Sequence, residues 1–242
     1  MRVCIDLFSL MMTILAAVTL APDVSYAEPL CDLSAPPLTK TWKRDDLNPD
    51  RPFFVRLGPD RYAVPWKYLF SRPRGVQSCE FSYPSVGLRF WLSDGSAPME
   101  DGTAGTSFRP KEVGKDPSNP LDTVVLVYSS EHYENNSAGR VNPDFYYQFA
   151  LGNFKTNTEK MASGLTKIIF ANRAPSHAAF YFSNDEYSFY ADCLLSRTCQ
   201  VFVDLKKVQL VFRAQLETGA IDYHGELAAR LSDFFTKWKV GK

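Results

Sequence analysis

The strongest constraint on this chain is a series of five short apolar segments in its C-terminal half, each followed by a turn signal. Turn residues recur there at a spacing of roughly ten residues, which is typical of antiparallel strands joined by short connections. The aromatic share of 14%, with 18 Phe and 12 Tyr, also favours strands over helices. The pattern predicts an antiparallel meander. Its strands are expected at Thr166–Ala171, Ala178–Ser183, Tyr187–Ala191, Gln200–Asp204 and Val208–Leu216.

Earlier segments predict further strands. Two short runs around the turn Leu57–Asp60 predict a hairpin, and their prolines place it at a sheet edge. Alternating apolar residues predict a half-buried strand over Val86–Leu92, and the apolar run Asp122–Ser129 predicts a central strand. The aromatic run Phe145–Phe149 is typical of a strand, whereas Thr156–Ser163 suggests a short polar turn or helix.

The chain ends in an amphipathic pattern that predicts a helix over about 225–240. Its apolar residues recur at helical spacing, and lysines near its end suit the negative pole of the helix dipole. The helix is expected to cover the sheet rather than lie on a membrane, because acidic residues flank the stripe. The predicted fold class is therefore α+β, mostly β, with an antiparallel meander under a C-terminal helix. The stripe is Leu227, Leu231, Phe234, Phe235 and Trp238.

The N-terminal residues 1–27 have the features of a secretory signal peptide. A minimal basic start precedes an apolar run of about 15 residues, and Ser25-Tyr26-Ala27 places small residues at a cleavage site. The apolar run is short for a membrane anchor. We expect export to the periplasm or beyond without stable membrane insertion. A polar lead-in, 28–50, is then followed by one mostly-β domain, 51–242.

Four cysteines remain after the predicted cleavage, since Cys4 leaves with the leader. An even number of cysteines in an exported chain favours two disulfides. We favour Cys193 with Cys199, which flank a turn, and Cys31 with Cys79, although four cysteines allow three pairings. A zinc site is disfavoured because the cysteines do not form two close pairs.

No local motif for catalysis or for a cofactor occurs in the sequence. The patterns that mark a nucleophile elbow, a zinc protease or a phosphate-binding loop are missing, and the three histidines are scattered. Basic and acidic residues are equal at 27 each, which argues against a nucleic-acid binder. We therefore expect no cofactor, no metal and no catalytic residue. The histidines are His132, His177 and His224.

The segment 93–120 is long, polar and without periodicity, which indicates a functional or mobile loop. Its acidic residues do not follow the spacing of a calcium-binding loop. Aromatic residues on the expected strands suggest core packing, with a ligand cleft as the alternative. The aromatic residues are Tyr181, Phe182, Tyr187, Phe189 and Tyr190, and the candidate binding residues of the loop are Asp94, Glu100, Asp101, Arg109 and Lys111.

The stretch Arg61–Leu69 followed by Val86–Leu92 resembles the opening of small exported proteins of proteobacteria. Their C-terminal part is also similar, with a cysteine-closed hairpin, a strand like Val208–Phe212 and a final helix ending near Trp238. Some of these proteins look like periplasmic immunity proteins, which neutralise toxins delivered by neighbouring cells. The resemblance covers about two thirds of the mature chain and brings no catalytic residues.

Three functions follow as hypotheses. The first is an exported interaction protein, of the immunity type, whose loop 93–120 caps or enters the cleft of a toxin or an envelope enzyme. The alternatives are a periplasmic protein that binds a small ligand or an envelope component, and an envelope hydrolase without a local motif.

Overall fold

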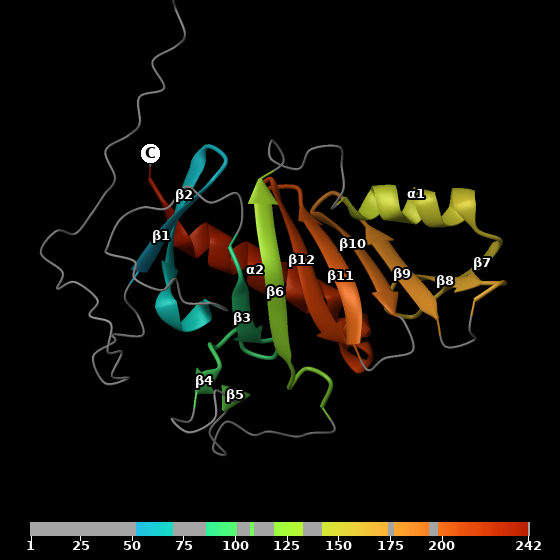
Figure 1. Cartoon of the computed structure of the whole chain (residues 1–242), viewed down its shortest axis with the longest axis horizontal. Coiled ribbons are helices and arrows are strands. Elements are labelled where there is room, and N and C mark those ends of the chain that lie inside the picture. Colours follow the sequence, from blue (N-terminus) through green and yellow to red (C-terminus); the bar gives the residue numbers. More distant parts are fainter. Residues whose placement is uncertain are drawn as a thin grey trace, which may run out of the picture. The chain divides into compact units, whose positions relative to one another are not determined.

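An antiparallel sheet of eight strands forms the centre of the part of the chain that the structure, a computed structural model, describes. The described residues are 52–69, 86–100, 107–108, 119–132, 142–173, 177–193 and 198–241, and they belong to one compact unit. The spatial order of the sheet is β3 (Leu88–Trp91), β6 (Val124–His132), β12 (Leu210–Glu217), β11 (Thr198–Leu205), β10 (Tyr187–Cys193), β9 (Ala178–Ser183), β8 (Thr166–Phe170) and β7 (Thr156–Lys160). Figure 1 shows the whole sheet, from β3 at one edge to β7 at the other.

The predicted meander is confirmed, because β8 to β12 are neighbours in both sequence and space. The turn Asn184–Glu186 shows why these positions break the strands. The Asn184 side chain accepts hydrogen bonds from the backbone nitrogens of Glu186 and Tyr187, each at 2.9 Å. Such an asparagine closes a tight turn by replacing the backbone partner that the strand would otherwise supply. The predicted central strand is also confirmed, since β6 pairs with β3 on one side and β12 on the other.

The prediction of a turn or helix over Thr156–Ser163 is wrong, because residues Thr156–Lys160 form the edge strand β7. This strand pairs in register with β8, from Thr156 opposite Phe170 to Lys160 opposite Thr166. The turn between them places Gly164 at a φ of +84°, a conformation that glycine adopts without strain. The polar composition of β7 reflects its exposed position at the sheet edge. Charged side chains on such an edge strand disfavour pairing with a strand of another molecule.

The C-terminal helix α2 (His224–Trp238) follows a 3₁₀ turn, Thr218–Tyr223, and covers one face of the sheet as predicted. Figure 1 shows α2 running behind β6, β12 and β11. Its apolar stripe enters the main core, where the rings of Phe235 and Phe212 lie 5.2 Å apart. The buried members of the stripe are Leu227, Leu231, Phe235 and Trp238.

The predicted N-terminal hairpin is confirmed as β1 (Pro52–Leu57) and β2 (Asp60–Pro65), and β13 (Lys239–Val240) pairs with β2 to make a separate three-stranded sheet. Tyr62 of β2 packs edge-on against Phe235 of α2, with ring centroids 5.1 Å apart. Lys239 forms an ion pair with Asp60 at 2.7 Å. The small sheet therefore ties the chain's last residues back to its first described strands.

The segment Phe145–Phe149 lies in a helix, α1 (Pro143–Asn153), so the prediction of a strand there is wrong. Asn142 caps the helix, since its side chain accepts from the backbone nitrogen of Asp144 at 2.8 Å, and Pro143 occupies the first turn. Both are signals of a helix start. They outweigh the strand preference of the aromatic residues, which is a weak tendency that depends on packing.

Helix α1 packs on the sheet face opposite to α2. Side chains alternate between the two faces along a strand. Phe189 of β10 accordingly belongs to the core under α2, and its neighbour Tyr190 belongs to a second cluster with Ala150 of α1. No helix within the described ranges is long and apolar enough to cross a bilayer.

Candidate protein-interaction surface

Two tyrosines of α1 hold the helix on the sheet. The Tyr146 ring stacks on Phe202 with centroids 4.3 Å apart, and the Tyr147 ring stacks on Tyr181 at 3.9 Å. The Tyr181 hydroxyl donates to the Asp144 carboxylate at 2.8 Å. Burial, aided by this bond, raises the pKa of Tyr181 to about 12, so the hydroxyl remains a donor over the physiological range. The orientation of α1 on the sheet is therefore well defined.

Three phenylalanines remain exposed on α1 and just after it. Phe145 is 50% exposed, Phe149 is 47% exposed and Phe154 is 36% exposed. The rings of Phe145 and Phe149 stack with centroids 6.1 Å apart, and Phe149 meets Phe154 edge-on at 6.1 Å. We call these three residues the aromatic ridge. Large exposed apolar side chains that touch one another mark interaction sites more often than scattered ones do.

Phe154 connects the ridge to the end of the sheet. Its ring meets the buried Phe170 edge-on at 5.6 Å. The guanidinium carbon of Arg173 lies 4.5 Å from the Phe154 centroid and 4.9 Å from the Phe170 centroid. A guanidinium held over aromatic faces is attracted by the ring quadrupoles, which restricts its motion.

Behind Arg173 lies a buried histidine. His177 is 3% exposed, and its ring stacks on Phe170 with centroids 4.8 Å apart. Arg173 Nη1 lies 3.1 Å from His177 Nδ1, and His177 Nε2 lies 2.6 Å from Asp192 Oδ1. The same Nη1 lies 3.2 Å from Nε2, so the guanidinium sits against both ring nitrogens. Because a carboxylate only accepts, Nε2 donates a proton to Asp192. Arg173, His177 and Asp192 thus form a continuous set of polar contacts.

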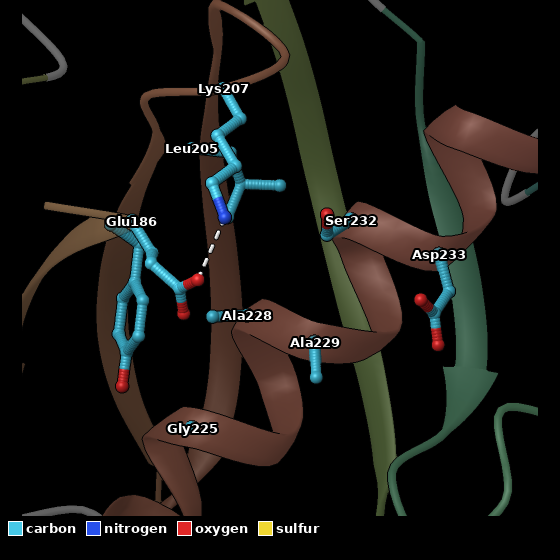
Figure 2. A pocket seen from close by; sticks show the side chains of 9 residues that line it. Glu186, Leu205, Lys207, Gly225, Ala228, Ala229, Ser232 and Asp233 are labelled. Atoms are coloured by element: carbon cyan, nitrogen blue, oxygen red, sulfur yellow. Dashed lines mark hydrogen bonds and ion pairs between the residues drawn. The ribbon is translucent and has the colours of Figure 1, made fainter.

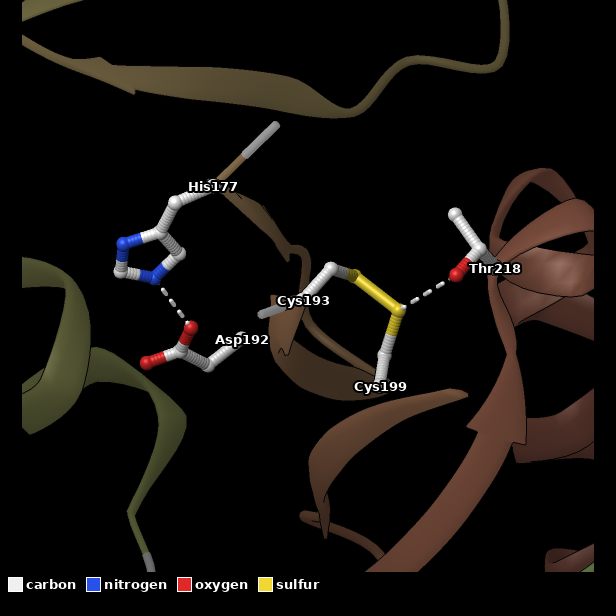
Figure 3. Close-up of a disulfide and its surroundings, with 5 residues drawn as sticks. All are labelled: His177, Asp192, Cys193, Cys199 and Thr218. Carbon is white, nitrogen blue, oxygen red and sulfur yellow. Dashed lines mark hydrogen bonds and ion pairs between the residues drawn. A yellow bond between two sulfur atoms is a disulfide. The ribbon is translucent and has the colours of Figure 1, made fainter. Parts of the chain in front are cut away.

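The predicted disulfide Cys193–Cys199 is confirmed and follows directly after Asp192. Its Cα atoms are 4.2 Å apart, and it joins β10 to β11 (Figure 3). Figure 3 also shows the Cys199 sulfur beside the Thr218 hydroxyl, 3.6 Å away. Both cysteines are buried. The covalent link holds the end of β10, and with it Asp192, against β11. The other predicted pair, Cys31–Cys79, lies outside the described residues.

Comparison with known proteins identifies no family for this chain. No family model matches it, and no curated protein matches it significantly. Two solved structures have a similar arrangement. One is an immunity protein of the Stenotrophomonas maltophilia type IV secretion system, with a TM-score of 0.48 and 14% identity over 79% of this chain and 94% of that one. The other is an iron-regulated outer membrane lipoprotein of Neisseria meningitidis, with a TM-score of 0.43 and 7% identity over 78% and 94%.

The likeness is weak. It agrees with the weak resemblance to exported, immunity-like proteins that the sequence suggested. It assigns no residue of this chain a role.

Of the predicted loop residues, the structure places two. Asp94 is exposed, and its carboxylate accepts from the backbone nitrogen of Ser96 at 2.8 Å. Glu100 belongs to a two-residue strand, β4 (Met99–Glu100), which pairs with β5 (Ser107–Phe108). The segment 93–120 thus contains a small ladder. Asp101, Arg109 and Lys111 lie outside the described residues, so the loop stays a prediction.

The start of this loop is attached to α2. Arg230 Nη2 donates to the Ser93 carbonyl at 2.7 Å, and the Ser93 hydroxyl donates to Asp122 at 3.1 Å. Gly95 has a φ of +71° and lies against Phe234. The loop therefore leaves the domain from a well-anchored point.

The five aromatic residues considered for a cleft lie on opposite faces of the sheet. Tyr181 and Tyr190 pack under α1, whereas Phe182, Tyr187 and Phe189 pack against the core under α2. Most of them therefore serve packing, and they do not converge on one cleft.

A pocket of about 250 Å³ does lie between α2 and the turns that join β9 to β10 and β11 to β12 (Figure 2). Gly225, Ala228 and Ala229 form its small apolar wall, and two other lining residues, Lys207 and Glu186, form an ion pair at 2.8 Å. Figure 2 shows the Glu186–Lys207 pair on one side of the lining residues and Asp233 on the other, farther along the helix. Both partners are mostly exposed, so the pair contributes little to stability.

The histidines show no arrangement for nucleophilic catalysis within the described residues. Both ring nitrogens of His177 are engaged by Arg173 and Asp192, and those of His224 by Tyr187 and the Ser163 carbonyl. A general base needs a free nitrogen facing a nucleophile. No group of three metal-ligating side chains gathers in these ranges either. The side chain of His132 is outside the described set.

Proposed function

We propose that this protein is an exported binding protein that docks a protein partner on the aromatic ridge and thereby inhibits it. The partner is a toxin or an envelope enzyme, as the sequence resemblance to immunity proteins implies. Catalysis has no part in this proposal.

The single observation that carries the proposal is the exposed stack Phe145, Phe149 and Phe154 beside Arg173. Interface cores are enriched in aromatic residues and arginine and depleted in other charged residues. The three rings are already ordered by their mutual contacts and by Tyr146 underneath. Association therefore immobilises few rotamers, which lowers the entropic cost of binding.

Two further observations support an exported protein. The leader-like residues 1–27 predict secretion, and the disulfide Cys193–Cys199 suits an oxidising compartment. In the periplasm a stable, disulfide-linked domain resists the proteolysis and unfolding that a loosely packed inhibitor would suffer.

The loop 93–120 is proposed as a second contact segment, with Asp94, Glu100, Asp101, Arg109 and Lys111 as its binding residues. It leaves the domain from the anchored Ser93, so a partner that meets it meets a tethered segment.

The decisive experiment compares variants of the full chain carrying a C-terminal tag and expressed in its native cell. The first variant is Phe145→Ala with Phe149→Ala. The matched control is Ile169→Ala, because Ile169 is 40% exposed but lies on the opposite face of β8 from the ridge. A third variant replaces Asp94 and Glu100 by alanine. Captured proteins are identified by mass spectrometry and their affinities measured with purified components.

We expect one stoichiometric partner with the wild type and the Ile169 variant. Loss of a central aromatic anchor costs about 2 kcal/mol or more, which weakens binding about thirtyfold. The partner, expressed alone in the same compartment, should be toxic, and the wild-type chain should suppress this toxicity while the double Phe variant should not. Equal capture by both variants would refute the ridge as the docking surface. Capture lost only in the Asp94/Glu100 variant would place docking on the loop.

A further inference from the structure

We infer that the partner surface that meets the ridge presents a carboxylate side chain flanked by apolar groups, and that Arg173 binds this carboxylate. The inference rests on the proposed function and specifies the chemistry of its partner.

Arg173 is exposed and has unused donors. Its Nη1 faces His177, at 3.1 Å from Nδ1 and 3.2 Å from Nε2, and no other hydrogen bond of the guanidinium occurs among the residues that the structure describes. A guanidinium has five N–H donors in a planar fork. The guanidinium carbon lies 4.5 Å from the Phe154 centroid and 4.9 Å from the Phe170 centroid, so apolar rings flank the group, and the edge of the fork that does not face His177 is left for an incoming acceptor. A carboxylate matches that edge with two parallel hydrogen bonds.

The nearby acidic groups of the chain are already engaged. Asp192 accepts from His177, and Asp144 accepts from the Tyr181 hydroxyl. Lys155, next to Phe154 in the chain, is exposed and makes no ion pair with any described residue. Both carboxylates keep their charge, but they are only partly exposed, whereas the cations Arg173 and Lys155 are exposed. Complementarity of charge across an interface steers encounter and excludes wrong partners, so an acidic group on the partner matches these two cations.

The ridge strengthens such a contact. When apolar partner groups cover Phe149 and Phe154, water leaves the neighbourhood of the guanidinium, and a hydrogen bond between charged groups is stronger in the lower local dielectric. His177 holds the Arg173 side chain from behind, because Nη1 contacts both ring nitrogens and the hydrogen bond to Asp192 fixes the orientation of the ring. The guanidinium is thus positioned before the partner arrives.

A nucleic acid fits this surface less well. Binding to a phosphate backbone uses a row of cations that neutralise successive phosphates. Here one guanidinium and one lysine lie beside three phenylalanines, and the whole chain has equal numbers of basic and acidic residues. A protein carboxylate beside apolar side chains is the better match.

The test uses two blocked dipeptides as probes, N-acetyl-phenylalanyl-glutamate amide and its glutaminyl analogue, which differ only in the charge of one side chain. Each is titrated into the full exported protein, and the backbone and Arg173 side-chain resonances are followed by NMR. Variants are Arg173→Gln and the matched control Lys167→Gln, a cation on the same strand as Phe170 but on the other face. Arg173→Lys keeps the charge without the planar fork.

We expect the glutamate probe to bind at the ridge about five- to tenfold more tightly than the glutamine probe, since a charged acceptor strengthens the bond to arginine. The preference should vanish in Arg173→Gln, fall in Arg173→Lys and persist in Lys167→Gln. It should also weaken as salt is added. Folding of each variant is verified from the dispersion of resonances far from the ridge, including those of α2.

Equal binding of the two probes, a preference that survives Arg173→Gln, or no shift at the ridge in millimolar probe would overturn the inference. Capture of the partner by the variants separates a failure of this inference from a failure of the proposed function. If its binding requires Phe149 but not Arg173, protein docking stands and the carboxylate inference falls. If the ridge variants capture the partner as the wild type does, the docking proposal itself falls.

Discussion

The Tyr187 hydroxyl lies 2.8 Å from Nδ1 of His224, joining strand β10 to the first residue of helix α2. The other ring nitrogen lies 3.3 Å from the Ser163 carbonyl, which can only accept. Nε2 therefore carries the proton and Nδ1 accepts from Tyr187. His224 is 4% exposed and lies among Phe182 and Phe189, so the folded protein holds it in the neutral form.

This arrangement predicts a loss of stability in acid. Burial lowers the pKa of His224, and this effect outweighs the opposite effects of the hydrogen bond to the Ser163 carbonyl and of the Glu226 and Asp222 charges. The unfolded chain then binds a proton more readily than the folded one. The stabilisation is complete above the ordinary histidine pKa of about 6.5 and is lost as the pH falls through the folded pKa. Urea unfolding at pH 7.5 and pH 5 measures it.

The control is His224→Gln, which keeps hydrogen-bonding groups but does not titrate. The free energy of unfolding should depend less on pH in this variant than in the wild type over the acidic range. An identical pH dependence in both proteins would show that His224 is not the group responsible.

The aromatic ridge should be dispensable for folding. Phe145→Ala and Phe149→Ala remove half-exposed rings, so each should change the free energy of unfolding by about 0.5 kcal/mol or less. Tyr146→Ala, by contrast, removes the ring stacked on Phe202 and Tyr190 and should cost about 3 kcal/mol. Chemical denaturation of the three variants checks this. A cost near that of Tyr146 for the exposed rings would assign the ridge to folding instead of binding.

The disulfide should contribute measurably to stability. Replacing Cys193 and Cys199 together by serine should cost about 2 kcal/mol in the chain-entropy account of a short loop, which corresponds to a Tm lower by about 5 °C. Thermal unfolding under oxidising conditions compares the double variant with the wild type. An unchanged Tm would mean that the β10–β11 pairing alone holds this hairpin.

Replacing Gly95 and replacing Gly152 by alanine should change the free energy of unfolding in opposite directions. Gly95→Ala forces a side chain into a φ of +71° and brings its Cβ within 3.1 Å of the Phe234 ring, which should cost about 1–2 kcal/mol. Gly152→Ala, in α1, meets no atom within 4 Å and should stabilise the protein by about 0.5–1 kcal/mol. Urea unfolding curves of the two variants measure both changes. A loss of stability in Gly95→Ala would show that the start of loop 93–120 needs the backbone conformation that Gly95 adopts.

The strands that were predicted correctly share a local cause. Between Thr166 and Leu216 turn-type residues separate the apolar runs in the sequence, and among the described connections Asn184 closes its turn with its own side chain. Alternation along a strand needs no distant information. The disulfide Cys193–Cys199 was predictable for a similar local reason, because its cysteines lie only six positions apart in the sequence.

Helix α1 was missed although a signal was present. Asn142-Pro143-Asp144 is a capping sequence, and it was outweighed by the aromatic residues that follow. The edge strand β7 was missed because a polar sequence contains no apolar alternation, and only its pairing with β8 makes it a strand.

The amino-acid sequence by itself determined the meander, its closing disulfide, the covering C-terminal helix and the prediction of export, because each depends on neighbouring residues or on a short repeat. Only the tertiary structure decided that Phe154, Arg173, His177 and Asp192 meet at one end of the sheet. They come from the end of α1, the β8–β9 connection and β10, and their contact depends on strand register and on the placement of α1. A surface assembled from separate elements exists only when all of those contacts are made together.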